Sequence, residues 1–106
     1  MTDEDARRKL VDFLDERAFQ PVLRAKPDDF PKDKRDELAD VQRSTESEQE
    51  RFRNYESAEK VVQMYRDDLS SEAAQKVHRQ LRDLGLPTLN DVRDDFEQRA
   101  RELGVR

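Results

Sequence analysis

Apolar residues recur every three or four positions along most of the chain, a spacing that places them on one face of an α-helix. The first such stripe contains Ala6, Leu10, Phe13, Leu14 and Ala18. No segment alternates between apolar and polar residues as a half-buried strand does. The pattern therefore predicts an all-α fold, in which four or five amphipathic helices form a small bundle and a single domain spans residues 1–106.

A proline interrupts the first stripe. Pro21 should kink or end the first helix, because it lacks an N–H group and clashes with the carbonyl four residues back. Val22 and Ala25 continue the stripe in phase, so we expect a short helical continuation after the proline, at an angle to the first helix. The segment 26–31 contains two prolines and two aspartates and is predicted to be a loop.

The centre of the chain carries ten residues, 42–51, without an apolar side chain. Segments with helical periodicity lie on both sides, and nothing in the stretch breaks a helix. One continuous or gently bent helix over residues 32–68 is the first expectation, with its polar middle projecting into solvent. Alternatively, Thr45 and Glu48 form a capping box, and the chain breaks into two helices near Thr45.

The last third of the chain contains two more helical stripes. Ser70 is a plausible N-cap for the first of these helices, and Gly85 followed by Leu86 fits a Schellman motif at its end. Thr88 then opens the final helix. Because the connection between these helices is short, residues 70–104 are expected to form an antiparallel helical hairpin.

The composition limits the size of the core. Of the 106 residues, 33% are hydrophobic and 44% are charged, so the helices can share only a thin apolar seam. Such a seam is often completed by a second copy or by a partner. The absence of Cys excludes disulfides and thiolate metal sites. No apolar run is long enough for a membrane span or a signal peptide, so a soluble, cytoplasmic protein is expected.

Candidate catalytic chemistry is sparse in this sequence. The single histidine, His78, has no nucleophile or orienting carboxylate at helical spacing, and we expect it at the surface or at its boundary. A metal site made of carboxylates alone has two candidate groups, but solvated helix faces explain these residues better: Asp91, Asp94 and Asp95, or Glu46 and Glu50. We therefore predict no enzyme activity, no cofactor and no functional metal.

One apolar stripe is rich in aromatic residues and gives the first functional hypothesis. A helix over residues 32–68 would span roughly 55 Å, too long for its partners, and its aromatic end would need cover from a second copy. The hypothesis is a non-catalytic interaction or regulatory module that forms a homodimer or binds another protein. A break in the helix would instead cover the stripe within a monomer. The residues predicted to serve packing or dimerisation are Phe52, Tyr55, Val62, Tyr65 and Leu69.

A basic band gives the alternative hypothesis. Lys76, Arg79 and Arg82 recur at three-residue spacing and can contact phosphate or an acidic partner. The alternative function is a nucleic-acid-associated regulator that uses this band. Nucleic acid is the less favoured partner, because the formal net charge is −5 and a basic excess is the usual footprint of such proteins. Weak or no binding to duplex DNA is expected at about 150 mM salt.

Overall fold

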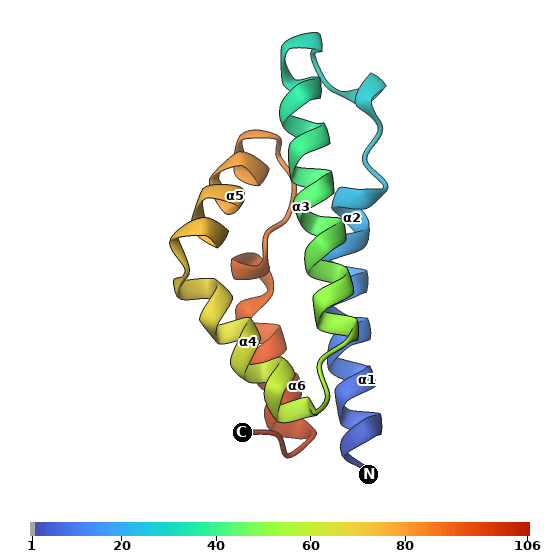
Figure 1. The fold of residues 1–106 in the computed structure, drawn as a ribbon, viewed down its shortest axis with the longest axis vertical. Helices are drawn as coiled ribbons and strands as arrows, with labels where there is room; N and C mark the ends of the chain where they lie inside the picture. Colours follow the sequence, from blue (N-terminus) through green and yellow to red (C-terminus); the bar gives the residue numbers. More distant parts are fainter. Residues whose placement is uncertain (1) are drawn as a thin grey trace.

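The computed structural model describes residues 2–106, of which 81% are helical and none lies in a strand. The predicted all-α fold is confirmed, and the described residues form an elongated body of 47 × 23 × 21 Å. One long helix is built from α1, a π-helical turn η1 and α2, and it runs beside α3, while α4, α5 and α6 lie on the other side (Figure 1). The main helices are α1 (Asp3–Leu14), η1 (Asp15–Phe19), α2 (Gln20–Leu23), α3 (Arg35–Arg53), α4 (Ala58–Ser70), α5 (Glu72–Asp83) and α6 (Arg93–Glu102).

The first helix continues past Pro21, as the sequence predicts. The turn before the proline is π-helical, and the N–H group of Gln20 donates to the carbonyl of Asp15, five residues back. This wider turn makes room for the proline ring, which has no N–H group to donate. The predicted loop then contains two short 3₁₀ turns, η2 (Pro27–Asp29) and η3 (Lys32–Lys34), before α3 begins.

The prediction of one helix over residues 32–68 is wrong, and so is the alternative break near Thr45. The chain breaks at residues 54–57, between α3 and α4. Ser57 caps α4, since its hydroxyl accepts from the N–H group of Lys60 at 3.1 Å. The turn folds α4 back onto α1, so the chain reverses direction where a straight helix was expected.

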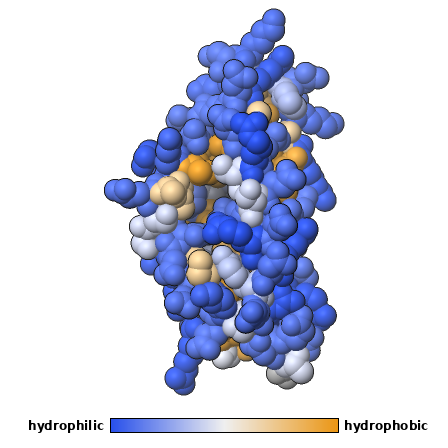
Figure 2. Space-filling model, viewed as in Figure 1, coloured by the Kyte–Doolittle hydropathy of each residue, from blue (hydrophilic) through white to orange (hydrophobic). Residues whose placement is uncertain are grey.

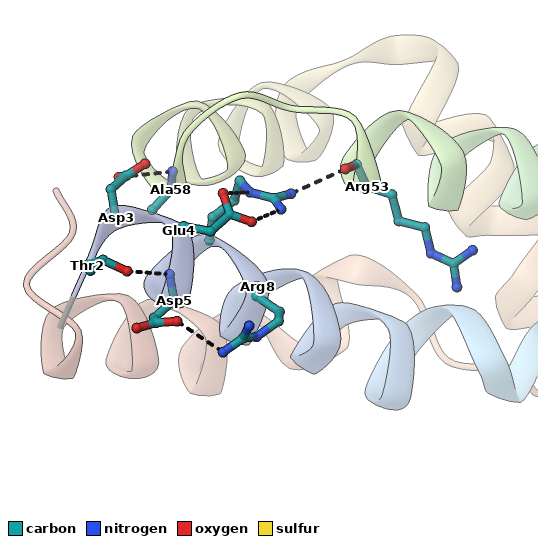
Figure 3. A network of polar contacts seen from close by, with 8 residues as sticks. Thr2, Asp3, Glu4, Asp5, Arg8, Arg53 and Ala58 are labelled. Carbon is teal, nitrogen blue, oxygen red and sulfur yellow. Dashed lines mark hydrogen bonds and ion pairs between the residues drawn. The ribbon is translucent and has the colours of Figure 1, made fainter.

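Two side chains near the start of α1 bond to the backbone on either side of this break (Figure 3). Arg7 donates to the carbonyl of Arg53, the last residue of α3, at 3.2 Å. Asp3 accepts from the N–H group of Ala58, the first residue of α4, at 3.3 Å. Helix ends leave such backbone groups without intrahelical partners, so two side chains of α1 complete the ends of two other helices.

Replacing Arg7 with Ala should lower the free energy of unfolding by about 1–2 kcal/mol, because the last carbonyl of α3 loses its donor. Arg8→Ala is the matched control: Arg8 pairs with Asp5 within α1 at 3.0 Å and should cost no more than about 0.5 kcal/mol. Urea unfolding followed by circular dichroism measures both variants. Equal losses would show that the contact between α1 and α3 contributes nothing of its own.

The C-terminal helices begin and end largely as predicted. The Schellman motif is confirmed: Gly85 has φ +71°, and the N–H group of Leu86 donates to the carbonyl of Leu81 at 2.9 Å. Thr88 opens a capping box with Asp91 at the start of the 3₁₀ turn η4 (Leu89–Val92), which leads into α6. The N-cap of α5 is Ser71 and not Ser70, which is the last residue of α4.

The expected hairpin over residues 70–104 needs a correction. The chain does reverse after Gly85, but α5 and α6 do not form a packed pair. Helix α5 packs mainly against α3 and α4, whereas α6 packs against α1. The η4 turn causes the difference, because it contacts η1 and α4 and carries the chain away from α5 before α6 begins.

The apolar core is thin, as expected, and it is divided in two. The larger cluster joins α1, η1, the end of α3, α4, η4 and α6, and at its centre the rings of Tyr65 and Phe96 stack with centroids 4.0 Å apart. The smaller cluster joins α2, α3 and α5 around Val22, Leu38 and Leu81. Outside these clusters the visible face is largely hydrophilic, with small apolar patches (Figure 2).

Candidate functional site

The aromatic stripe predicted for packing or dimerisation lies inside the chain. Phe52, Val62 and Tyr65 are fully buried, and Tyr55 and Leu69 are half-buried against the larger cluster. The turn at residues 54–57 brings α1 and α6 over these side chains. The uncovered aromatic end that argued for a homodimer is therefore not present, and the oligomeric state stays a prediction without this support.

The basic band lies on the outer face of α5, whose inner face buries His78 and Leu81. Lys76, Arg79 and Arg82 are all exposed. Within the described chain, none of the three comes within ion-pair distance of a carboxylate. Their charges are thus available to a group outside the molecule.

The polar stretch 42–51 projects into solvent only in part, whereas the sequence predicted that its whole length would do so. Thr45 and Gln49 are buried, Gln42 and Glu48 are half-buried, and the other six residues are exposed. The two glutamines find polar partners on the neighbouring helix. Gln42 donates to the carbonyls of Val22 and Ala25 at 3.1 and 2.9 Å. Gln49 donates to Asp15 at 2.5 Å. Buried polar groups are tolerated when they are hydrogen-bonded in this way, and here they form a polar layer between the two apolar clusters.

A pair of carboxyl groups lies in this polar layer. The side chains of Glu48 and Asp68 are only 17% and 12% exposed, and Asp68 is within hydrogen-bonding reach of Glu48. Arg51 is the cation beside them, 3.9 Å from Glu48 and 3.7 Å from Asp68. Burial, followed by the bond to Asp68 and its charge, raises the pKa of Glu48 to about 8, against the smaller opposing effect of Arg51.

His78 is also part of the polar layer, so the expectation of a surface or boundary histidine is wrong. Its side chain is 2% exposed, and its Nδ1 atom has no hydrogen-bond partner among the described residues. With Thr45 and Glu48 it lines a cavity of about 10 Å³, room for the centre of about one water molecule. Burial, and then the charge of Arg82, lower the pKa of His78, which favours the neutral imidazole.

The sequence did hold a signal for this position. His78 follows Ala74 by four residues and precedes Leu81 by three, so it belongs to the buried stripe of α5. The basic residues beside it indicate a solvated face of the same helix. Helical spacing alone would have placed the imidazole inside.

The described residues form open surface hollows of about 630 Å³ between α4 and α6 and about 690 Å³ along the start of α5, and one small buried cavity. The cavity beneath α5 is too small for more than about one water molecule. No group of three or more His, Asp and Glu side chains that could hold a metal occurs within residues 2–106. The acidic residues weighed as a carboxylate metal site are exposed: Glu46, Glu50, Asp91, Asp94 and Asp95. The candidate site therefore consists of an exposed positive surface on α5 and, beneath that helix, a buried set of titratable groups.

Comparisons of the chain with protein-family models, with curated proteins and with solved structures found no match. In the part of the chain that the structure describes, every helix is too short or too polar to cross a membrane. A functional proposal therefore depends on the surface of α5 and on its surroundings.

Proposed function

We propose that this protein is a small, non-catalytic interaction module that binds an acidic segment of another protein through the basic band of α5, formed by Lys76, Arg79 and Arg82. The observation that carries the proposal is that all three side chains are exposed and that none has an ion-pair partner among residues 2–106. The band lies on a regular helix whose inner face is packed on α3 and α4, so its cations are presented in a fixed arrangement. Fixed charges of this kind steer an oppositely charged partner and set its orientation.

An acidic protein segment suits this band better than nucleic acid does. Glu72 and Asp83 lie at the two ends of α5, and the whole chain carries a formal charge of −5. A polyphosphate backbone repeats its charge every few ångströms and would meet these carboxylates. A short acidic peptide can end before it reaches them. Self-association through the aromatic stripe is not part of the proposal, because that stripe is covered within the chain.

Fluorescence anisotropy with a labelled oligoglutamate peptide tests the proposal. Binding should weaken between about 50 and about 150 mM salt, because exposed charges are screened. Replacing Lys76, Arg79 and Arg82 together with Ala should raise Kd about tenfold, since three exposed ion pairs contribute up to about 0.5 kcal/mol each. Circular dichroism should show unchanged helix content in this variant.

The control variant replaces Lys26, Lys32 and Lys60 with Ala. These residues are also exposed, and they form no ion pair with the described carboxylates, so net charge changes equally in both variants. An equal rise in Kd in the control would mean that overall charge, and not the band, governs binding. Tighter binding of a duplex DNA of similar length would favour the nucleic-acid alternative instead.

A further inference from the structure

The polar layer contains more acidic groups than cations that can neutralise them. Glu48 from α3 and Asp68 from α4 meet in the seam where α5 packs on both helices. Arg51 is the one cation in ion-pair range of both carboxyls among the described residues, and its side chain is 51% exposed. Two buried carboxylates side by side repel each other strongly. One charge can be balanced by Arg51, and the other carboxyl is left to carry a proton.

A second observation agrees with this count of charges. The Oδ2 atom of Asp68 is buried and has no hydrogen-bond donor among the described residues when both carboxyls are ionised. A buried acceptor without a donor costs about 1–3 kcal/mol. A protonated Glu48 supplies that donor, because a neutral carboxyl group has an O–H that can bond to Asp68. The same proton removes the repulsion and satisfies the unpaired oxygen.

We propose that Glu48 and Asp68 form a proton-binding site between α3 and α4, and that loss of the shared proton loosens the seam in which α5 is packed. With the proton in place, the two side chains form a hydrogen-bonded link between the helices. Without it, two negative charges face each other at a position shielded from water. The proposal concerns the folded body itself and is independent of the partner proposed for α5.

The other groups that face this site cannot replace the proton. Tyr55, in the turn after α3, has its pKa raised chiefly by burial and remains neutral. His78 faces the site from α5 and is held neutral by burial and by Arg82, against the weaker influence of Asp68 and Asp91. Arg51 remains the only neighbouring positive charge described.

The direction of the pH effect follows from Glu48 and His78. The pKa of Glu48 is raised from 4.5 to about 8, so its contribution to stability is complete below about pH 4.5 and is lost as the pH rises to about 8. The pKa of His78 is lowered from 6.5, so its contribution is complete above about pH 6.5 and is lost as the pH falls. The range between about pH 6.5 and about pH 8 therefore isolates the carboxyl pair.

Urea unfolding of the full chain across that range tests the proposal. The equilibrium constant for unfolding of the natural sequence should rise at least tenfold between about pH 6.5 and about pH 8, since one pKa unit corresponds to a factor of ten. Glu48→Gln should abolish this rise, because the amide donates to Asp68 at every pH. Asp68→Asn should abolish it as well, and it serves as the second variant if Glu48→Gln does not fold.

Glu46→Gln is the matched control, an exposed carboxyl on the same helix, and it should keep the pH dependence of the natural sequence. A carbon-13 NMR titration should also show the Glu48 carboxyl changing ionisation near pH 8 and not near 4.5, the value for an unperturbed Glu. Unfolding that is independent of pH in the natural sequence would overturn the proposal. A pH dependence that survives unchanged in Glu48→Gln and in Asp68→Asn would overturn it equally.

Discussion

Replacing Tyr65 with Ala is expected to lower the free energy of unfolding by about 3–5 kcal/mol, the usual cost of removing a large aromatic side chain from a core. Tyr65 is fully buried, and its ring stacks on Phe96 with centroids 4.0 Å apart. Its hydroxyl donates to the carbonyl of Leu89 at 2.5 Å. One side chain thus holds α4, η4 and α6 together. Urea unfolding at about pH 6 measures the loss.

Tyr65→Phe separates the two contributions, because it keeps the ring and removes the hydroxyl. This variant should lose about 1–3 kcal/mol, since the buried Leu89 carbonyl is left without its donor. A loss as large as that of Tyr65→Ala would show that the stacked ring contributes little. No loss at all would show that the Leu89 carbonyl finds another donor when the hydroxyl is gone.

Phe52→Asp is expected to unfold the chain and not merely to separate two copies. Phe52 has no exposed surface, and its ring lies 5.8 Å from that of Phe19 and 5.2 Å from that of Tyr55. An ionised carboxylate buried there should cost more than about 4 kcal/mol, a large part of the stability of a small domain. Circular dichroism should show loss of most helical signal at about 25 °C.

Light scattering decides whether a second copy is involved. The natural sequence should scatter as a monomer with a mass near 12.6 kDa, because the aromatic stripe is covered internally. Ser47→Asp introduces the same charge at an exposed position of α3 and should leave both helix content and mass unchanged. A natural sequence with twice that mass, converted by Phe52→Asp into a folded monomer, would restore the homodimer hypothesis.

The helices could be predicted because their signals are local. Stripes of apolar residues and caps at Gly85 and Thr88 depend on neighbours within about one or two turns, and the N-cap of α5 was misplaced by a single residue, at Ser70 in place of Ser71. The break at residues 54–57 was missed because Phe52, Tyr55 and Ala58 keep helical spacing across it. The backbone groups at that break find their hydrogen-bond partners far away in the sequence, because the side chains of Arg7 and Asp3 bond to them.

The polar layer could not be predicted for the same physical reason. Whether Glu48 or Gln49 is exposed depends on which side chain faces it, and their partners Asp68 and Asp15 lie on other helices. A polar residue carries no periodic signal that separates a solvated face from a hydrogen-bonded interior. The position of His78 was within reach of the sequence, because its spacing follows the stripe of α5. The residues of the basic band are exposed on α5, and their role as a binding surface and their partner stay a proposal.

The polar layer also determines how far the helices can slide along one another. Two apolar faces alone would tolerate displacement by a helical turn of about 5.4 Å, because one aliphatic contact resembles the next. Such a displacement would bring Gln49 and Glu48 against the apolar clusters and remove the hydrogen bond from Gln49 to Asp15. Hydrogen-bonded groups enclosed by apolar packing are known to fix alignment in helical assemblies. The stretch of this sequence that is poorest in apolar residues thus selects one alignment of α3 against its neighbours and disfavours the others.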